Sequence, residues 1–149
     1  MRENAMTRLL RFITNDYTPF QWIEKITDCG TLGCYTGRVY RKNKTNEDSW
    51  HNDMTQQRRV AMSINLSPRP YKGGNLFMRN EKSGKVWEVP NHGFGDMIIF
   101  RLSHDLTHMV SGLEGENPKI AYAGWFRAKP DYLRTVKKLK KYYRTGVPI

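Results

Sequence analysis

The sequence contains only two cysteines, Cys29 and Cys34, among its 149 residues. Two cysteines do not make a disulfide framework, and neither lies in a paired motif of the kind that binds zinc. The chain also lacks any apolar run close to the ~20 residues of a membrane span. Its first residues are too interrupted by charge for a secretory signal. We therefore expect a protein of the reducing cytoplasm that does not cross a membrane.

Acidic residues are also scarce. The chain has 14 Asp and Glu against 25 Lys and Arg, which gives a formal net charge of +11. A basic chain favours anionic partners such as nucleic acids, but charge alone identifies no partner, and no recognised nucleic-acid motif accompanies it. Nucleic acid stays an open partner on these grounds. The length suits a single domain spanning residues 1–149.

Short strands separated by glycine and proline dominate the middle of the chain. Residues 60–66 alternate apolar and polar side chains, with Val60, Met62, Ile64 and Leu66 on one face. This alternation is typical of a half-buried strand. Further strands are expected at residues 31–40, 76–78, 86–89 and 97–102. Such a series predicts a mainly β fold of the sandwich or jelly-roll type.

A helix is expected before the strands. Thr18 is suited to cap it, Pro19 to its first position, and Gln21 completes a capping box. Gly30 is placed to end it. A shorter amphipathic helix is expected over residues 6–14. The buried stripe of the longer helix is expected to contain Phe20, Ile23 and Ile26, with Trp22 alongside.

The end of the chain is strongly basic. Residues 130–149 carry six Lys and Arg against one Asp. The apolar residues Tyr132, Val136, Leu139 and Tyr143 recur there at helical spacing. We expect a basic amphipathic helix over residues 130–145, whose charged faces are either solvated or bind anions.

Three residues form a candidate metal site. On a strand, residues i and i+2 share a face, so His51 and Asp53 can present an imidazole and a carboxylate to one point. His108 would complete a set of two histidines and one carboxylate. This facial set, which leaves the opposite coordination positions open, is typical of non-haem Fe(II) oxygenases.

The other two histidines are weaker candidates. His92 lies in a Gly-flanked turn, where an exposed imidazole is expected. His104 and His108 bracket a segment similar to the H-E-x-x-H motif of zinc proteases. That motif needs a helix and a glutamate, whereas this segment has Asp105 and is expected to be a strand running into a loop.

Residues 30–128 resemble the 2-oxoglutarate- and Fe(II)-dependent dioxygenases, most closely their small prolyl-4-hydroxylase-like branch. Each matching motif alone is weak, but seven of them occur in the family's order. They are His51-Asn52-Asp53, Gly73-Gly74, Pro90, Gly95-Asp96 before the apolar strand, His108, Lys119 and Trp125.

The resemblance implies a double-stranded β-helix over residues 30–128, with a helical flank at 1–29. It implies Fe(II), 2-oxoglutarate and O₂, with the metal held by His51, Asp53 and His108. It also implies that decarboxylation of 2-oxoglutarate to succinate is coupled to C–H hydroxylation, for which an amino-acid side chain is the expected substrate. Asp53 favours hydroxylation over halogenation, because related halogenases lack this carboxylate.

Lys119 is the expected partner of the distal carboxylate of 2-oxoglutarate. Strand alternation puts Ala121 and Ala123 on the same face, which leaves room for a small diacid. By the resemblance, a strand tyrosine adds a hydroxyl to that carboxylate; either Tyr35 or Tyr40 suits this role. The opposite face carries Ile120, Tyr122 and Phe126, which suits packing under a helix.

Candidate substrate-binding residues are Trp50, Arg59 and Arg127. Arg127 shares the face of Lys119 but lies ~26 Å farther along an extended strand, too far to serve the same carboxylate. The substrate is expected to be a small molecule, a peptide or a protein. Two alternatives stay open: a non-catalytic basic β-domain that binds nucleic acid or another polyanion, and a metal-binding jelly roll that does not use 2-oxoglutarate.

Overall fold

Antiparallel strands form the body of this computed structural model, which describes residues 4–6, 9–10, 14–43, 47–55, 57–90 and 93–129. The main sheet has the order β1-β9-β2-β6. It consists of β1 (Cys34–Lys42), β9 (Lys119–Arg127), β2 (Arg58–Asn65) and β6 (Met97–Arg101). A second sheet, in the order β5-β4-β7, consists of β5 (Val86–Val89), β4 (Leu76–Asn80) and β7 (Leu106–Val110). The short strands β3 (Lys72–Gly73) and β8 (Leu113–Glu114) pair with each other.

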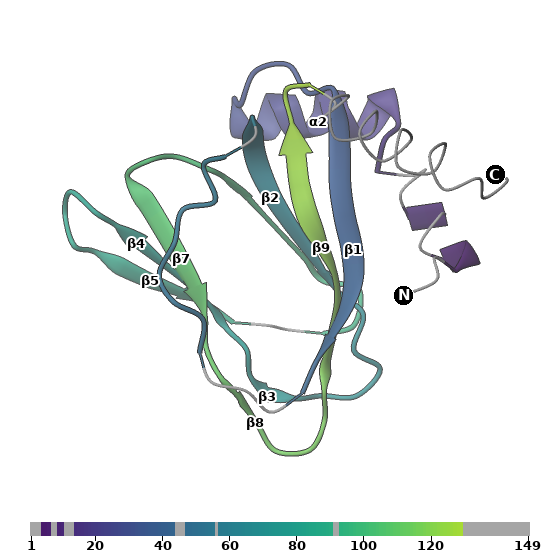
Figure 1. The fold of residues 1–149 in the computed structure, drawn as a ribbon, viewed down its shortest axis with the longest axis vertical. Coiled ribbons are helices and arrows are strands. Elements are labelled where there is room, and N and C mark those ends of the chain that lie inside the picture. Colours follow the sequence, from purple (N-terminus) through teal and green to yellow (C-terminus); the bar gives the residue numbers. More distant parts are fainter. Residues whose placement is uncertain are drawn as a thin grey trace, which may run out of the picture.

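The arrangement is the expected jelly-roll type, the double-stranded β-helix, with a helix across the outer face of the main sheet (Figure 1). Figure 1 shows the β5-β4-β7 sheet inclined against the main sheet, with β3 and β8 at the opposite end from α2. Among the described residues, no helix is long and apolar enough to be a membrane span. The basic helix expected at residues 130–145 lies outside the described residues.

Helix α2 (Tyr17–Thr27) begins one residue earlier than its expected cap. Asp16, not Thr18, is the N-cap, and its side chain accepts a hydrogen bond from the Thr18 backbone N–H at 2.9 Å. Asp28 ends the helix in a left-handed conformation, with φ 46°, so Gly30 is not the terminating residue. Of the shorter helix expected over residues 6–14, residues 6, 9 and 10 are helical.

The main core lies between α2 and the outer face of the main sheet. Phe20 of α2 packs edge-on against Phe126 of β9, with ring centroids 5.8 Å apart. Val60 and Met62 of β2 are buried in the same cluster, as their alternation predicted. Burial of each such side chain contributes ~1.5–3 kcal/mol. The buried face of the helix is narrower than expected, because Ile26 and Trp22 are each 53% exposed.

A β-bulge changes the facing of one segment of β2. Arg58 pairs with Arg127 and Val60 with Phe126, so Arg59 has no partner of its own on β9. Such an extra residue shifts the strand's alternation by one position. Arg58 therefore turns inward with Ala61, whereas uninterrupted alternation from Val60 would turn it toward the helix.

Candidate metal centre

Backbone hydrogen bonds bring His51 and His108 together. The His51 N–H donates to the His108 carbonyl at 3.0 Å, and the His108 N–H donates to the His51 carbonyl at 2.8 Å. This reciprocal pair extends the β5-β4-β7 sheet by one short segment beside β7. Residues that exchange both hydrogen bonds across antiparallel strands point their side chains to the same face. The two imidazole centroids accordingly lie 4.4 Å apart.

Asp53 reaches the same point by a different route from the expected strand. It lies in a loop and adopts a left-handed conformation with φ 52°. Aspartate tolerates this conformation better than most residues do. The expectation that residues 51–53 form one extended strand was therefore wrong. The left-handed residue turns the chain so that the carboxylate still faces both histidines.

The donor atoms of His51, Asp53 and His108 all lie within 4.8 Å of one another. Asp53 Oδ2 is 3.4 Å from His108 Nε2 and 4.0 Å from His51 Nε2. His51 Nδ1 donates to the Ser49 carbonyl at 2.7 Å, which leaves its Nε2 lone pair for a metal. Two imidazoles and a carboxylate at these separations fit a single Fe(II) ion.

The carboxylate of Asp53 is ionised in this setting. Burial alone would raise its pKa, but the contacts with His108 and Trp125 and the charge of Arg58 hold the pKa below its ordinary value. Trp125 Nε1 donates to Oδ2 at 2.8 Å, and Arg58 Nη1 lies 3.0 Å from Oδ1. Sequence reasoning did not select Arg58, because only the bulge turns it toward this carboxylate.

Among the described residues, one further histidine, His104, does not join the site. His104 is exposed in the turn before β7, and no helix spans it and His108, so the protease-like interpretation has no structural basis. His92 lies outside the described residues. Phe100 of β6 places its ring edge-on to His108, with centroids 5.0 Å apart, and this ring covers one side of the imidazole.

Lys119 points inward and is only 4% exposed. Its Nζ donates to the Gly74 carbonyl at 2.6 Å and lies 5.8 Å from the centroid of the Tyr71 ring. Burial, followed by the charge of Lys42, lowers its pKa to about 8. As expected, Tyr122 and Phe126 occupy the opposite face of β9, within the core under α2.

The structure separates the two candidate tyrosines. Tyr35 packs between Tyr122 and Phe126, with ring centroids 5.5 and 4.6 Å away, so it lies on the outer face of the sheet. The expectation that Tyr35 contacts the carboxylate of 2-oxoglutarate is therefore wrong. Tyr40 is the register partner of Ala121 and has the inward parity of Lys119.

Tyr71 is a further hydroxyl near Lys119 that sequence reasoning missed. Its buried hydroxyl has no hydrogen-bond partner among the described residues. Burial raises its pKa to about 12, with a smaller contribution from Tyr40. Buried hydroxyls are usually hydrogen-bonded, so an unpartnered one beside a buried lysine is suited to a bound carboxylate. Its position in a proline-rich turn gave no sequence signal for this role.

The three candidate substrate residues have different surroundings. Arg59 Nη1 donates to the Cys29 carbonyl, so it braces the segment after α2 and its selection as a substrate residue is corrected. Trp50 stacks under Arg79, whose Cζ is 4.4 Å from the ring centroid. Arg79 alternates with Met78, the register partner of His108, so Trp50 faces away from the triad. The expectation that Trp50 binds the substrate is therefore wrong.

Arg127 is buried at the opposite end of β9 from Lys119. It is the register partner of Arg58 and therefore lies at the same end of the sheet as the Asp53 contacts. This placement agrees with the expectation that Arg127 and Lys119 serve different groups.

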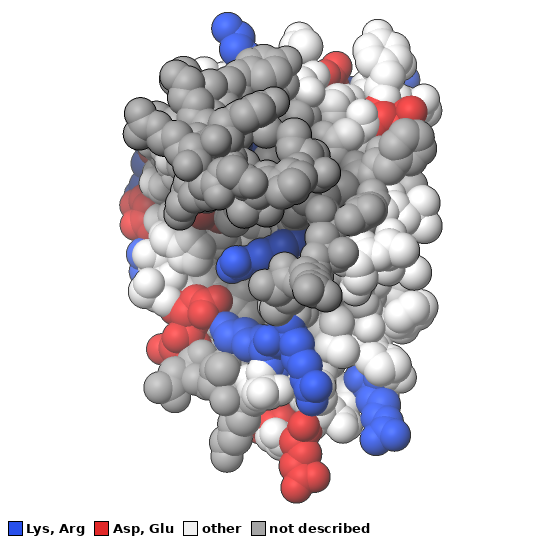
Figure 2. Space-filling model, turned by 45° about the vertical axis from the view of Figure 1, so that its right-hand side comes forward, with Lys and Arg blue, Asp and Glu red and all other residues white. Residues whose placement is uncertain are grey.

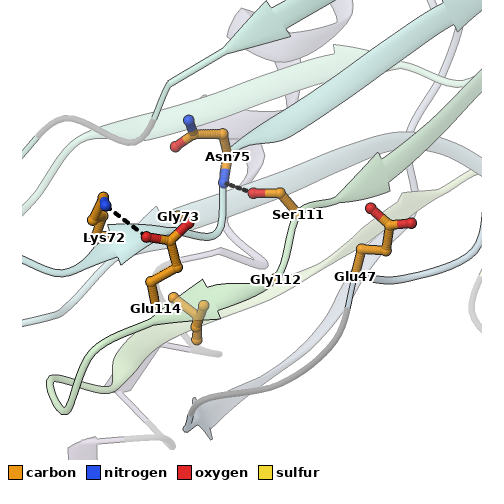
Figure 3. Close-up of a pocket in the computed structure, with 8 residues that line it drawn as sticks. Glu47, Lys72, Gly73, Asn75, Ser111, Gly112 and Glu114 are labelled. Carbon is orange, nitrogen blue, oxygen red and sulfur yellow. Dashed lines mark hydrogen bonds and ion pairs between the residues drawn. The ribbon is translucent and has the colours of Figure 1, made fainter.

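A surface hollow lies at another part of the molecule. Figure 3 shows Asn75 and Ser111 joined across it by a hydrogen bond, with the Lys72–Glu114 ion pair beside them. Glu47, Gly73, Gly112 and Leu113 complete its lining. None of His51, Asp53 and His108 lines this hollow, so it is not the metal centre.

Comparison with known proteins agrees with this geometry. The family described as the 2OG-Fe(II) oxygenase superfamily matches residues 36–127. A comparison with curated proteins found no match. Among solved structures, an oxidoreductase of the 2OG-Fe(II) oxygenase family from Burkholderia pseudomallei is similar, with TM-score 0.64 and 16% identity. That similarity covers 81% of this chain and 57% of the other.

Two further solved structures share the fold. A prolyl-4-hydroxylase from Pseudomonas putida matches with TM-score 0.55 and 21% identity, over 72% of this chain and 58% of that one. A prolyl hydroxylase from Trichoplax adhaerens, in complex with a hypoxia inducible factor peptide fragment, matches with TM-score 0.51 and 20% identity. That match covers 66% of this chain and 47% of the other. The chain thus spans about half the length of the structures it resembles.

Proposed function

The chain belongs to the 2OG-Fe(II) oxygenase superfamily, and from that membership we propose that it is an Fe(II)- and 2-oxoglutarate-dependent dioxygenase. The observation that carries the proposal is the convergence of His51, Asp53 and His108, whose donor atoms lie within 4.8 Å of one another. When bound, the metal and co-substrate supply O₂ activation, with decarboxylation of 2-oxoglutarate to succinate and hydroxylation of a C–H bond.

The protein's own residues bind and orient these groups. The two Nε2 atoms and the Asp53 carboxylate hold the iron and leave the remaining positions to ligands. Lys119 pairs with the distal carboxylate of 2-oxoglutarate, and the hydroxyls of Tyr40 and Tyr71 donate to the same group. Burial of Lys119 excludes water from that pair, which strengthens it.

A charged lysine suits this role because its present partner is weak. The Gly74 carbonyl is the only acceptor that its Nζ contacts among the described residues. A carboxylate would neutralise the buried charge and offset the desolvation that lowers its pKa. Ala121 on the same face is fully buried, and its small side chain leaves space for the carbon chain of a diacid.

We infer that the substrate is an amino-acid side chain, free or within a peptide or protein. Support comes from the fold shared with two prolyl hydroxylases. Nucleic acid is less well supported. On the face drawn in Figure 2, the described residues include acidic side chains beside the basic ones, and a mixed surface attracts a polyanion less than a purely basic one does.

Anaerobic titration of the purified protein tests the proposal. Fe(II) with 2-oxoglutarate is expected to give the weak visible charge-transfer band of a chelated complex, which neither component gives alone. Admission of O₂ should then release succinate. A matched His108→Ala variant should give neither signal, because it lacks one ligand. A wild-type protein that binds Fe(II) without any change on adding 2-oxoglutarate would indicate a metal-binding jelly roll of another activity.

A further inference from the structure

The two oxygens of the Asp53 carboxylate have different partners. Oδ1 faces the Arg58 guanidinium, with Nη1 at 3.0 Å. Oδ2 accepts the Trp125 indole N–H at 2.8 Å and is the oxygen that lies 3.4 Å from His108 Nε2. We propose that Arg58 and Trp125 form a clamp that holds Asp53 as a one-oxygen metal ligand, with Oδ2 toward the metal. The inference rests on the proposed iron site and assigns both side chains as positioning residues.

The clamp is itself well fixed. The Arg58 guanidinium stacks on the Trp125 indole, with Cζ 3.6 Å from the ring centroid. The side chains of Arg58 and Asp53 are each only 17% exposed. An arginine that stacks on an aromatic face and pairs with a carboxylate loses little freedom for each contact it makes. The three side chains therefore hold one another in a single arrangement.

The backbone also sets the clamp. The Thr55 N–H donates to the Asp53 carbonyl at 2.7 Å, and the Arg58 N–H donates to the Thr55 carbonyl at 3.0 Å. This turn carries the chain from the left-handed Asp53 into β2. The bulge at the start of β2 then gives Arg58, not Arg59, the inward direction. The bulge is thus the feature that places a cation behind the carboxylate.

One-oxygen binding matters because coordination positions are limited. A carboxylate turns easily about its last side-chain bond, so an unheld aspartate can offer both oxygens to a metal. The second oxygen would use a position that the facial set leaves for 2-oxoglutarate or O₂. Arg58 prevents this by holding Oδ1, and Trp125 fixes the rotation through Oδ2.

Cobalt(II) is a suitable probe, because it does not oxidise readily in air and its visible spectrum reports coordination number. The variants are Arg58→Met, which keeps the stem, Arg58→Gln, which keeps a neutral donor, and Trp125→Phe, which keeps the ring but loses the N–H. Arg59→Met is the matched control, since the adjacent arginine contacts the Cys29 carbonyl instead. Circular dichroism and thermal melting establish that each variant is folded.

We expect Arg58→Met and Trp125→Phe to change the cobalt spectrum and to weaken metal binding by roughly ten- to a hundredfold, the usual effect of losing a group that orients a metal ligand. Arg58→Gln should recover part of the affinity and the wild-type spectrum. Arg59→Met should match wild type in both measurements.

Wild-type spectra and affinities in both Arg58→Met and Trp125→Phe would overturn the clamp. If Arg58→Met does not fold, Trp125→Phe decides: an unchanged spectrum overturns the clamp, and an altered one supports it. A wild-type protein that binds no cobalt at all would instead overturn the proposed function, so the two failures are distinguishable.

Discussion

Lys42 and Lys119 are direct register partners where β1 meets β9. Lys42 forms an ion pair with the partly exposed Asp48, with its Nζ 2.8 Å from Asp48 Oδ1. Lys119 is buried, and burial together with the neighbouring lysine lowers its pKa to about 8. Because Lys42 is paired with Asp48 and Lys119 donates only to the Gly74 carbonyl among the described residues, Lys119 is the cation of this pair that is left to attract a carboxylate.

The first prediction concerns pH. Below about 8 Lys119 is protonated in the free protein and attracts a carboxylate; above it the charge is lost. The affinity for 2-oxoglutarate should therefore fall as pH rises through this value, by up to about tenfold per pH unit. Titration of the metal-loaded protein between about pH 7 and 9.5 measures it. Lys119→Arg should remove the decline, because arginine stays charged.

The second prediction concerns Lys119 as the partner of the distal carboxylate of 2-oxoglutarate. Lys119→Met should weaken 2-oxoglutarate binding by roughly ten- to a hundredfold, the magnitude expected for a charge-assisted contact. Metal binding should persist, since the triad is untouched. Isothermal titration with Co(II) and then 2-oxoglutarate separates the two. Arg127→Met is the comparison at the other end of β9; a larger loss of 2-oxoglutarate affinity in that variant would contradict the assignment.

The third prediction concerns the metal ligands. Alanine at His51 or His108 should lower metal stoichiometry strongly, whereas His104→Ala should not, because that imidazole is exposed outside the triad. His92→Ala is predicted to retain metal as well. Metal content after gel filtration measures each variant. Full retention by His108→Ala together with loss in His104→Ala would reverse the ligand choice.

The fourth prediction concerns the close approach of β1 and β9. Gly124 is the register partner of Gly37, and a Cβ built on Gly124 would lie 2.1 Å from the Thr36 carbonyl oxygen. Because backbone cannot move aside easily, Gly124→Ala should lower the free energy of unfolding by roughly 2–4 kcal/mol. Urea denaturation measures it. Gly84→Ala, at an open turn, should cost only about 1 kcal/mol, from its positive φ.

The second glycine of this pair, Gly37, is crowded by the side chain of Tyr35. The Tyr35 ring lies over Gly37, where a Cβ would be 2.5 Å from a ring carbon. Burial raises the pKa of Tyr35 far above its ordinary value, so it stays neutral. Its place in the core, and not beside the co-substrate, follows from this fit.

Alternation along strands was the most informative part of the sequence. It correctly assigned the faces of β9, with Lys119 and Ala121 inward and Tyr122 under the helix, because period-two patterning survives wherever a strand is regular. Alternation did not assign the facing of Arg58, where a bulge adds one residue. A bulge depends on how many residues the partner strand contributes, and the sequence of one strand does not carry that count.

Other differences have local causes. The convergence of His51 and Asp53 was predicted from strand geometry, yet a left-handed Asp53 produces it. The cap of α2 shifted to Asp16 because an aspartate side chain caps a helix at least as well as threonine. Tyr71 was missed since its partner, Lys119, is remote in sequence and meets it only through the turn at Gly74.

The reciprocal hydrogen bonds between His51 and His108 have a kinetic consequence. Among the described residues, the backbone of the segment before Asp53 bonds to β7 through this pair and through one more bond, from the Asp48 N–H to the Val110 carbonyl. A metal ion bound by both imidazoles would link the same two segments a second time. Release of the ion and fraying of this edge then become one event, so amide protons at residues 48 and 51 should exchange with solvent on the timescale of metal loss.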